Sequence, residues 1–170
     1  MKKTMKKAFL MLALLVIPFA MQAQTKFHDV EANDAKGAVK SITISVMGQT
    51  QKHTFTQEGK EENLKNAVYD ENGYLQSSEM EARGMTIKVT YKWENGKIKT
   101  QTHTVEGQEM PINFVYNDKG EIVKQSMNMM GNDITIEYSD YKYDDKGNWI
   151  SRKTSVRDRE METPRTIEYY

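Results

Sequence analysis

The segment YDDKGNW, residues 143–149, is the last of four similar phrases in this chain. The others are YDENGYL from residue 69, WENGKI from residue 93 and YNDKGEI from residue 116. In each phrase an aromatic residue precedes acidic or amide residues and then a glycine. An Asp or Asn side chain accepts hydrogen bonds from N–H groups of its own turn, and glycine supplies the positive φ that closes it. The phrase therefore predicts a β-hairpin turn, present four times.

The stretches between these turns alternate apolar and polar residues, as MTIKVTYKW at 85–93 does. A period of two is typical of a half-buried strand. The segments predicted as strands are 38–47, 50–57, 64–69, 74–82, 85–93, 97–105, 110–116, 121–129, 133–143, 148–157 and 162–169. We expect an all-β fold, an antiparallel meander of about eleven strands built from repeated hairpins. Because open twisted sheets seldom exceed about ten strands without curling, we expect this sheet to be strongly curved or rolled into a barrel-like form.

The turns also predict which residues face each other across each hairpin. Three loops end in a glycine at their third residue, and Asn95-Gly96 forms a two-residue loop, so the register of all four hairpins follows. The pairs that lie two steps from each loop all join an aromatic residue to an apolar one: Tyr69 with Leu75, Trp93 with Ile98, Tyr116 with Ile122, and Tyr143 with Trp149. Farther along the return strands the apolar residues change face. Either a bulge shifts the phase or both faces are partly covered.

The N-terminus predicts export. Four lysines precede an apolar run from Ala8 to Ala20, which is the pattern of a secretory signal peptide. The run is shorter than the roughly 20 residues that span a bilayer as a helix. We expect residues 1–23 to be a cleaved signal peptide, 24–37 a lead-in segment and 38–170 a single β-meander domain. The chain has no Cys, so we expect neither a lipid anchor nor disulfides in a periplasmic or extracellular protein.

The charge balance excludes some partners. The leader holds four of the 24 basic side chains and none of the 24 acidic ones, so the rest of the chain is net acidic by four. This balance argues against nucleic acid as a partner. Strand segments such as KIKTQTHTV at 97–105 offer no apolar row to lipid, so we expect no membrane span after signal cleavage.

The repeats resemble known proteins. Their Tyr-Asp-x-x-Gly phrases resemble the YD hairpins of RHS-type proteins, which build long β-sheet walls. The wider pattern is similar to small exported Bacteroidetes proteins of unknown function. It consists of KGAVKS at 36–41, the four turns, GNW at 147–149 followed by Arg152, and IEYY at 167–170. RHS repeats usually place Arg after the glycine, where this chain has Tyr74, Lys97, Glu121 and Asn148. The resemblance implies a sheet built from hairpins and export from the cytoplasm. It implies no activity and no functional residue.

Few residues indicate catalysis or metal binding. The chain has no Cys and three His residues without the partners that nucleophilic catalysis needs. We expect no cofactor and no metal. Eight methionines lie near the strand ends opposite the aromatic turns: Met47, Met80, Met85, Met110, Met127, Met129, Met130 and Met161. The favoured interpretation is that these flexible side chains fill gaps at that end of the sheet. A weaker alternative is that Met127, Met129 and Met130 bind Cu(I).

These observations favour an exported, soluble, non-catalytic binding protein. Its ligand would be a protein, a glycan or an apolar small molecule held by exposed members of the aromatic row. The candidate ligand-binding residues are Tyr91, Trp93, Tyr141, Tyr143 and Trp149. Core packing of this row is the competing interpretation. The alternatives are an assembly module that pairs through exposed edge strands at 38–47 or 162–169, and a glycan-active enzyme, which needs two acidic side chains facing each other across a cleft.

Overall fold

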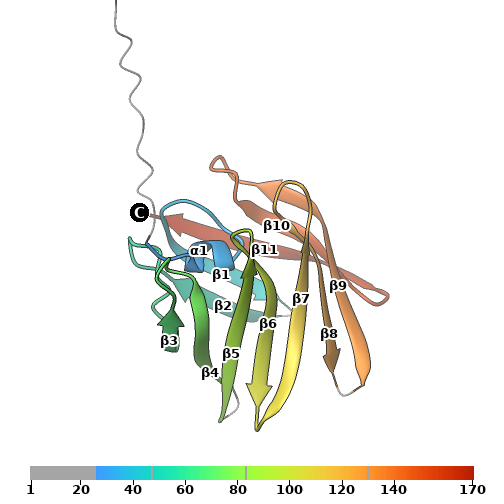
Figure 1. The fold of residues 1–170 in the computed structure, drawn as a ribbon. Helices are drawn as coiled ribbons and strands as arrows, with labels where there is room; N and C mark the ends of the chain where they lie inside the picture. The colour runs from blue at the N-terminus through green and yellow to red at the C-terminus, as the bar shows by residue number, and fades with distance from the viewer. Residues whose placement is uncertain (1–25, 47, 83, 130) are drawn as a thin grey trace, which may run out of the picture.

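The computed structural model describes residues 26–170 except 47, 83 and 130. The proposed signal peptide therefore lies outside the described residues. One short helix precedes eleven strands (Figure 1). The elements are α1 (Asp29–Ala32), β1 (Val39–Val46), β2 (Gln49–Thr54), β3 (Lys65–Tyr69), β4 (Leu75–Ala82), β5 (Met85–Glu94), β6 (Lys97–Val105), β7 (Gln108–Tyr116), β8 (Ile122–Met129), β9 (Asn132–Tyr143), β10 (Trp149–Val156) and β11 (Arg159–Tyr169).

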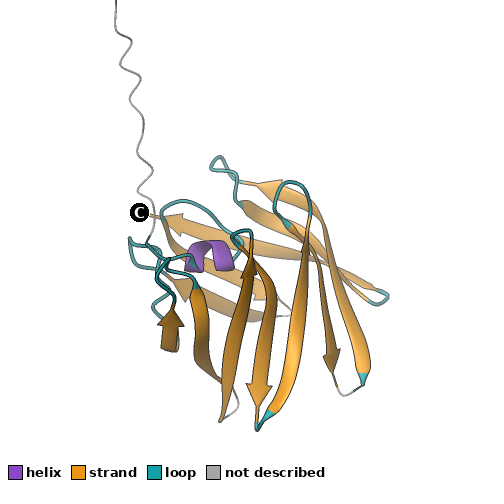
Figure 2. Ribbon diagram, viewed as in Figure 1, coloured by secondary structure: helices purple, strands orange, loops and turns teal. Residues whose placement is uncertain are grey.

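All eleven strands form one antiparallel sheet, which confirms the predicted all-β meander (Figure 2). The order in the sheet is β2-β1-β11-β10-β9-β8-β7-β6-β5-β4-β3. Strands therefore follow the chain from β3 to β11, and the β1–β2 hairpin then adds to β11. The segments expected as exposed edges are instead neighbours, because Ile42 of β1 pairs with Ile167 of β11. The edges of the sheet are β2 and β3.

The expected closure into a rolled, barrel-like sheet is not found. Among the described strands β2 and β3 pair with one neighbour each, so the sheet is open. The link between them folds on itself, with a bridge between Phe55 and Glu61 and a hydrogen bond of 2.8 Å from the Thr56 N–H to the Lys60 carbonyl. This folded link stands where two edge strands would need to meet.

The three longer aromatic turns have the same hydrogen bonds. In the last one, Asp144 Oδ1 accepts from the N–H groups of Lys146 at 3.0 Å and Asn148 at 2.8 Å, and the Gly147 N–H donates to the Asp144 carbonyl. Asp70 and Asn117 make the equivalent contacts in their turns. The Asp or Asn side chain that follows the aromatic residue of each phrase thus organises the turn, as predicted.

The predicted register is confirmed in all four hairpins. The observed pairs are Tyr69 with Leu75, Trp93 with Ile98, Tyr116 with Ile122, and Tyr143 with Trp149. Directly after each of these pairs, the second strand of the hairpin contains one extra residue with no residue paired opposite it. This β-bulge is the reason that the apolar residues change face along the strand. The bulged positions are Gln76, Lys99, Val123 and Ile150.

A side chain from the next strand donates to the main-chain carbonyl just before each bulge. Trp93 Nε1 donates to the Leu75 carbonyl at 2.7 Å, and the Tyr116 hydroxyl donates to the Ile98 carbonyl at 2.9 Å. The Tyr141 hydroxyl bonds the Ile122 carbonyl, and Arg165 Nε bonds the Trp149 carbonyl at 2.8 Å. We call these four contacts the bulge clasps. Because a bulge disrupts the backbone ladder, the clasps supply hydrogen bonds where the strand pairing is interrupted.

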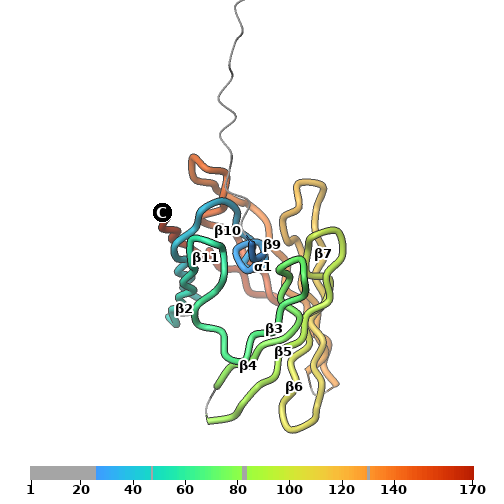
Figure 3. The backbone as a smooth tube through the Cα atoms, turned by 60° about the vertical axis from the view of Figure 1, so that its left-hand side comes forward, coloured from blue at the N-terminus to red at the C-terminus, as the bar shows by residue number. Residues whose placement is uncertain are grey.

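The lead-in segment packs on one face of the sheet, here called the inner face (Figure 3). Val30 and Ala35 join a buried cluster with Val39, Ile42 and Phe55. Ala32 packs against a second cluster, which contains Ile98, Phe114, Ile122 and Tyr138. The segment begins beside the first aromatic turn, where the His28 N–H donates to the Gly73 carbonyl at 3.2 Å. Val30, Ala32 and Ala35 of the lead-in segment are therefore packed into the core of this domain.

The six described methionines lie toward the ends of the strands away from the aromatic turns, as predicted. Met85 pairs with Ala82 and Met129 pairs with Asn132, each beside a turn of this opposite end. Met80, Met85 and Met129 are exposed. Met47 and Met130 lie outside the described residues.

The bulge clasps predict the effect of removing one hydroxyl. Tyr116→Phe keeps the ring but leaves the Ile98 carbonyl without its donor, so the free energy of unfolding should fall by about 1–3 kcal/mol. Tyr143→Phe removes the hydroxyl of an exposed ring and should change it by less than about 0.5 kcal/mol. Urea denaturation measures both. Equal effects of the two substitutions would show that the clasp adds nothing to stability.

The close approach of the lead-in segment to the first turn gives a second prediction. A Cβ at Gly73 would lie 1.9 Å from the Lys26 carbonyl oxygen, whereas one at Gly120 meets only the flexible Lys97 side chain, at 3.3 Å. Both glycines have positive φ, so Ala costs about 1–2 kcal/mol at either position for the backbone alone. Gly73→Ala should cost clearly more than Gly120→Ala in thermal or urea unfolding, because it also displaces residues 26–28. If both substitutions lower the free energy of unfolding equally, the contact between Gly73 and the lead-in segment does not contribute to stability.

Candidate functional site

A cavity of about 560 Å³ lies between the inner face of the sheet and the lead-in segment. Its walls come from strands on both sides of the sheet order and from α1. The aliphatic and aromatic wall is formed by Leu75, Val89, Ile98, Phe114 and Ile122. All five side chains are buried. They are the apolar residues that face inward on β4 to β8, so the hairpin register itself builds this wall.

A charged cluster forms part of the cavity beside Trp149. Trp149 Nε1 donates to Asp34 Oδ2 at 2.9 Å, and Arg152 Nη1 lies 3.6 Å from the same oxygen. The Arg152 guanidinium stacks on Tyr138, 3.6 Å from the ring centroid, and on Trp149 at 4.2 Å. Burial raises the pKa of Asp34, and the charges of Arg152 and Arg165 oppose that shift. The largely shielded carboxylate of Asp34 therefore lies near two guanidinium groups.

Arg165 fixes the lead-in segment to the sheet. Its Nη1 donates to the carbonyls of Asn33 at 3.1 Å and Asp34 at 3.0 Å, while its Nε bonds the Trp149 carbonyl. Its guanidinium lies 3.6 Å from the centroid of Trp149. Trp149 is thus in contact with two arginines, and Arg165 is engaged by structural hydrogen bonds.

A second polar cluster anchors α1 near the edge strands. Asp29 Oδ2 accepts from the Tyr69 hydroxyl at 2.6 Å and from the Glu61 N–H at 2.7 Å. Glu61 in turn contacts His53 Nδ1 at 2.6 Å and accepts from Asn33 Nδ2 at 3.0 Å. Burial raises the pKa of Asp29, although the bonds from Tyr69 and Glu61 favour its charged form. These carboxylates join β2, β3 and the 55–64 link to the lead-in segment.

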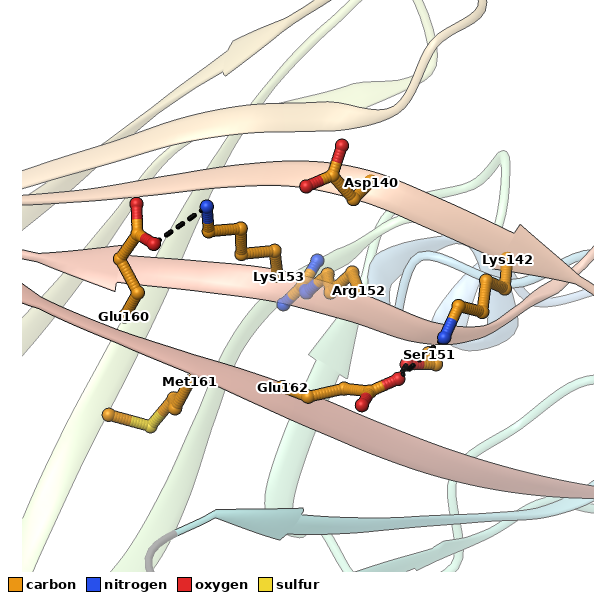
Figure 4. A pocket seen from close by; sticks show the side chains of 8 residues that line it. All are labelled: Asp140, Lys142, Ser151, Arg152, Lys153, Glu160, Met161 and Glu162. Carbon is orange, nitrogen blue, oxygen red and sulfur yellow. Dashed lines mark hydrogen bonds and ion pairs between the residues drawn. The ribbon is translucent and has the colours of Figure 1, made fainter.

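A shallow groove of about 340 Å³ also lies over β9 to β11 (Figure 4). Its charged side chains are mostly paired with one another across the strands. Lys142 bonds Glu162 at 2.9 Å, Ser151 bonds Glu162 at 2.6 Å, and Lys153 bonds Glu160 at 2.7 Å. Exposed ion pairs of this kind are common on sheets and contribute little energy each. The cavity is therefore the stronger candidate site.

The five residues predicted to bind a ligand have different environments. Tyr91 and Trp149 line the cavity, where the Tyr91 hydroxyl lies 3.2 Å from Ser78 Oγ. Trp93 and Tyr141 form bulge clasps. Burial raises the pKa of Tyr141 to about 12, so its hydroxyl keeps its proton at neutral pH. Tyr143 is exposed and donates to Glu121. The row is thus used mainly to join hairpins.

Sequence patterns missed the polar groups of the cavity. Asp34 lies in the lead-in segment, which has no periodicity, and Asp29 lies five residues before it. Arg152 had one signal, its place after the GNW turn in the resemblance to exported proteins. Among the described residues no group of three or more His, Cys, Asp or Glu side chains is arranged to hold a metal. The copper alternative involves Met130, which lies outside the described residues.

Comparison with known proteins assigns the chain to no family. No family model matches the chain, and no curated protein matches it. Within the described part of the chain, no helix is long and apolar enough to cross a membrane.

The buried Asp29 predicts a pH-dependent contribution to stability. Because its pKa is raised above the ordinary 3.8, the folded protein holds this proton more tightly than the unfolded chain. Asp29 thus stabilises the fold most below pH 3.8, and this contribution is lost as the pH rises through the folded pKa. The free energy of unfolding of the wild type, relative to Asp29→Asn, should fall as the pH rises from 3 to 7.

A control of opposite sign is Glu81→Gln. The hydrogen bond and charge of Lys65 lower the pKa of Glu81 below 4.5, so its contribution is present above that pH and lost as the pH falls. Urea titrations at several pH values measure both differences. A flat difference for Asp29→Asn would mean that the carboxyl group is ionised as easily in the folded protein as in the unfolded chain.

Proposed function

We propose that this chain is an exported, soluble binding protein that holds an apolar small molecule in the inner-face cavity and catalyses no reaction. The observation that carries the proposal is the cavity itself, about 560 Å³ with an aliphatic and aromatic wall. Ligand sites of small molecules typically measure about 300–1,000 Å³ and combine such walls with a few polar groups. We also propose that the sheet curves around this cavity.

The lining favours an apolar ligand over the other two classes. A glycan is usually held by exposed aromatic faces, and of the five candidate aromatic residues Tyr143 alone is exposed. A protein partner needs an exposed surface, whereas the apolar residues of this wall are buried. The signal peptide predicted from the sequence and the resemblance to exported proteins support the proposed location.

The two alternatives have weaker support. The edge strand β2 presents Gln, Thr and Lys side chains, and β3 carries a bulge where Asn66 has positive φ. Both features discourage edge-to-edge pairing, which disfavours an assembly module. The adjacent carboxyl groups of Asp29 and Glu61 would suit a glycan-active enzyme, but their hydrogen bonds fasten α1, and we propose a structural role for them.

A neutral fluorescent probe tests the proposed site. N-Phenyl-1-naphthylamine should bind the wild-type protein with increased fluorescence, because the cavity wall excludes water from it. Gln101 lines the cavity, and Gln101→Trp should abolish the increase by filling that volume. Thr102→Trp places the same ring on the opposite face of β6 and should leave binding unchanged. Circular dichroism verifies that both variants fold. Absence of probe binding to the wild type, or equal binding by both variants, would contradict the proposal.

A further inference from the structure

Arg152 has few hydrogen bonds for a guanidinium that is mostly shielded from solvent. Its side chain is 11% exposed and lines the cavity. A guanidinium has five N–H donors. Those of Arg152 make two long contacts, a hydrogen bond of 3.4 Å to the Tyr141 hydroxyl and a 3.6 Å ion pair with Asp34. Its buried Nε has no partner within the described part of the chain. Arg165 makes three hydrogen bonds of 2.8–3.1 Å, and its buried Nη2 is likewise without a partner within the described residues.

The charge around Arg152 is positive overall. Asp34 is the acidic group that faces it, and this carboxylate also accepts the Trp149 N–H and interacts with the charge of Arg165. Lys97 adds a further positive charge near Asp34. The charge of Asp144 also acts on Arg165. Two carboxylates thus lie among three basic side chains, Arg152, Arg165 and Lys97, and the remaining positive charge favours an anion in this part of the cavity.

We infer that the cavity takes an apolar molecule that ends in a carboxylate, with Arg152 as the residue that binds the carboxylate. This inference rests on the proposed function and names the ligand class of the same cavity. Guanidinium and carboxylate groups match in geometry, and a charge-assisted hydrogen bond between them is short and strong. Stacking between Tyr138 and Trp149 holds the guanidinium plane in place before the ligand arrives.

The rest of the cavity suits the apolar part of such a ligand. Ile122, Phe114 and Ile98 continue the wall away from Arg152, and Val89 and Met80 extend it toward the open edge of the sheet. The lining also contains two charged residues near the sheet edges, Lys52 on β2 and Glu79 on β4. A linear aliphatic acid would therefore have its carboxylate beside Arg152 and its chain along β8 to β4.

The test compares three twelve-carbon probes by displacement of N-phenyl-1-naphthylamine: laurate, dodecanol and dodecylamine, each below its aggregation limit. Wild-type protein should bind laurate at least about tenfold more tightly than dodecanol, because a hydrogen bond to a charged group contributes about 1.5–3 kcal/mol. Arg152→Gln should abolish this preference while dodecanol still binds. Lys153→Gln removes a positive charge from the same strand but from the outer groove, and should keep the preference.

Each outcome separates the two proposals. Equal binding of laurate and dodecanol by the wild type, tighter binding of dodecylamine, or an unchanged preference in Arg152→Gln would overturn the carboxylate inference and leave the cavity proposal intact. Failure of all three probes and of the naphthylamine to bind would overturn both. If Arg152→Gln does not fold, Arg152→Lys keeps the charge without the planar fork and should reduce the preference, and the wild-type ratio alone still decides.

Discussion

The hydrogen bonds that side chains donate to main-chain carbonyls at the bulges hold this sheet together. Each aromatic hairpin contains a bulge one step beyond its aromatic pair, and there the backbone ladder is interrupted. Trp93, Tyr116, Tyr141 and Arg165 supply the missing donors from the neighbouring strand. Because a buried carbonyl without a donor is costly, Trp93 and Tyr141 of the aromatic row are needed for structure. Tyr91 and Trp149 instead line the cavity.

The lead-in segment completes the domain and creates the cavity. It is fastened near the edge strands through Asp29 and near β10 and β11 through Asp34 and Arg165. Between these attachments α1 lies over the inner face without filling it. Polar anchoring at both ends explains how a short segment with few apolar residues remains in place.

The sequence predicted the local features of the fold and missed the distant ones. Turn chemistry determines the register over seven residues, so the pair Tyr143 and Trp149 followed from the loop alone. The pairing of Ile42 with Ile167 joins the two ends of the chain and leaves no local pattern. The same holds for the site, because Asp34 and Arg152 are far apart in the sequence and come together only when the lead-in segment packs on the sheet. Tyr91 and Trp149 were recognised as candidates, but through a row whose main role is structural.

We propose that the bulge clasps hold the hairpins together and that the cavity beneath α1 binds the ligand. Mapping of backbone amide shifts in a ¹H–¹⁵N NMR titration with N-phenyl-1-naphthylamine tests this proposal most directly. We expect the largest shift changes at Val89, Ile98 and Phe114, whose side chains form part of the wall. We expect small changes at the exposed Tyr143 and in the turn that follows it. Changes concentrated at Tyr143 and its neighbours, with the wall residues unaffected, would contradict it.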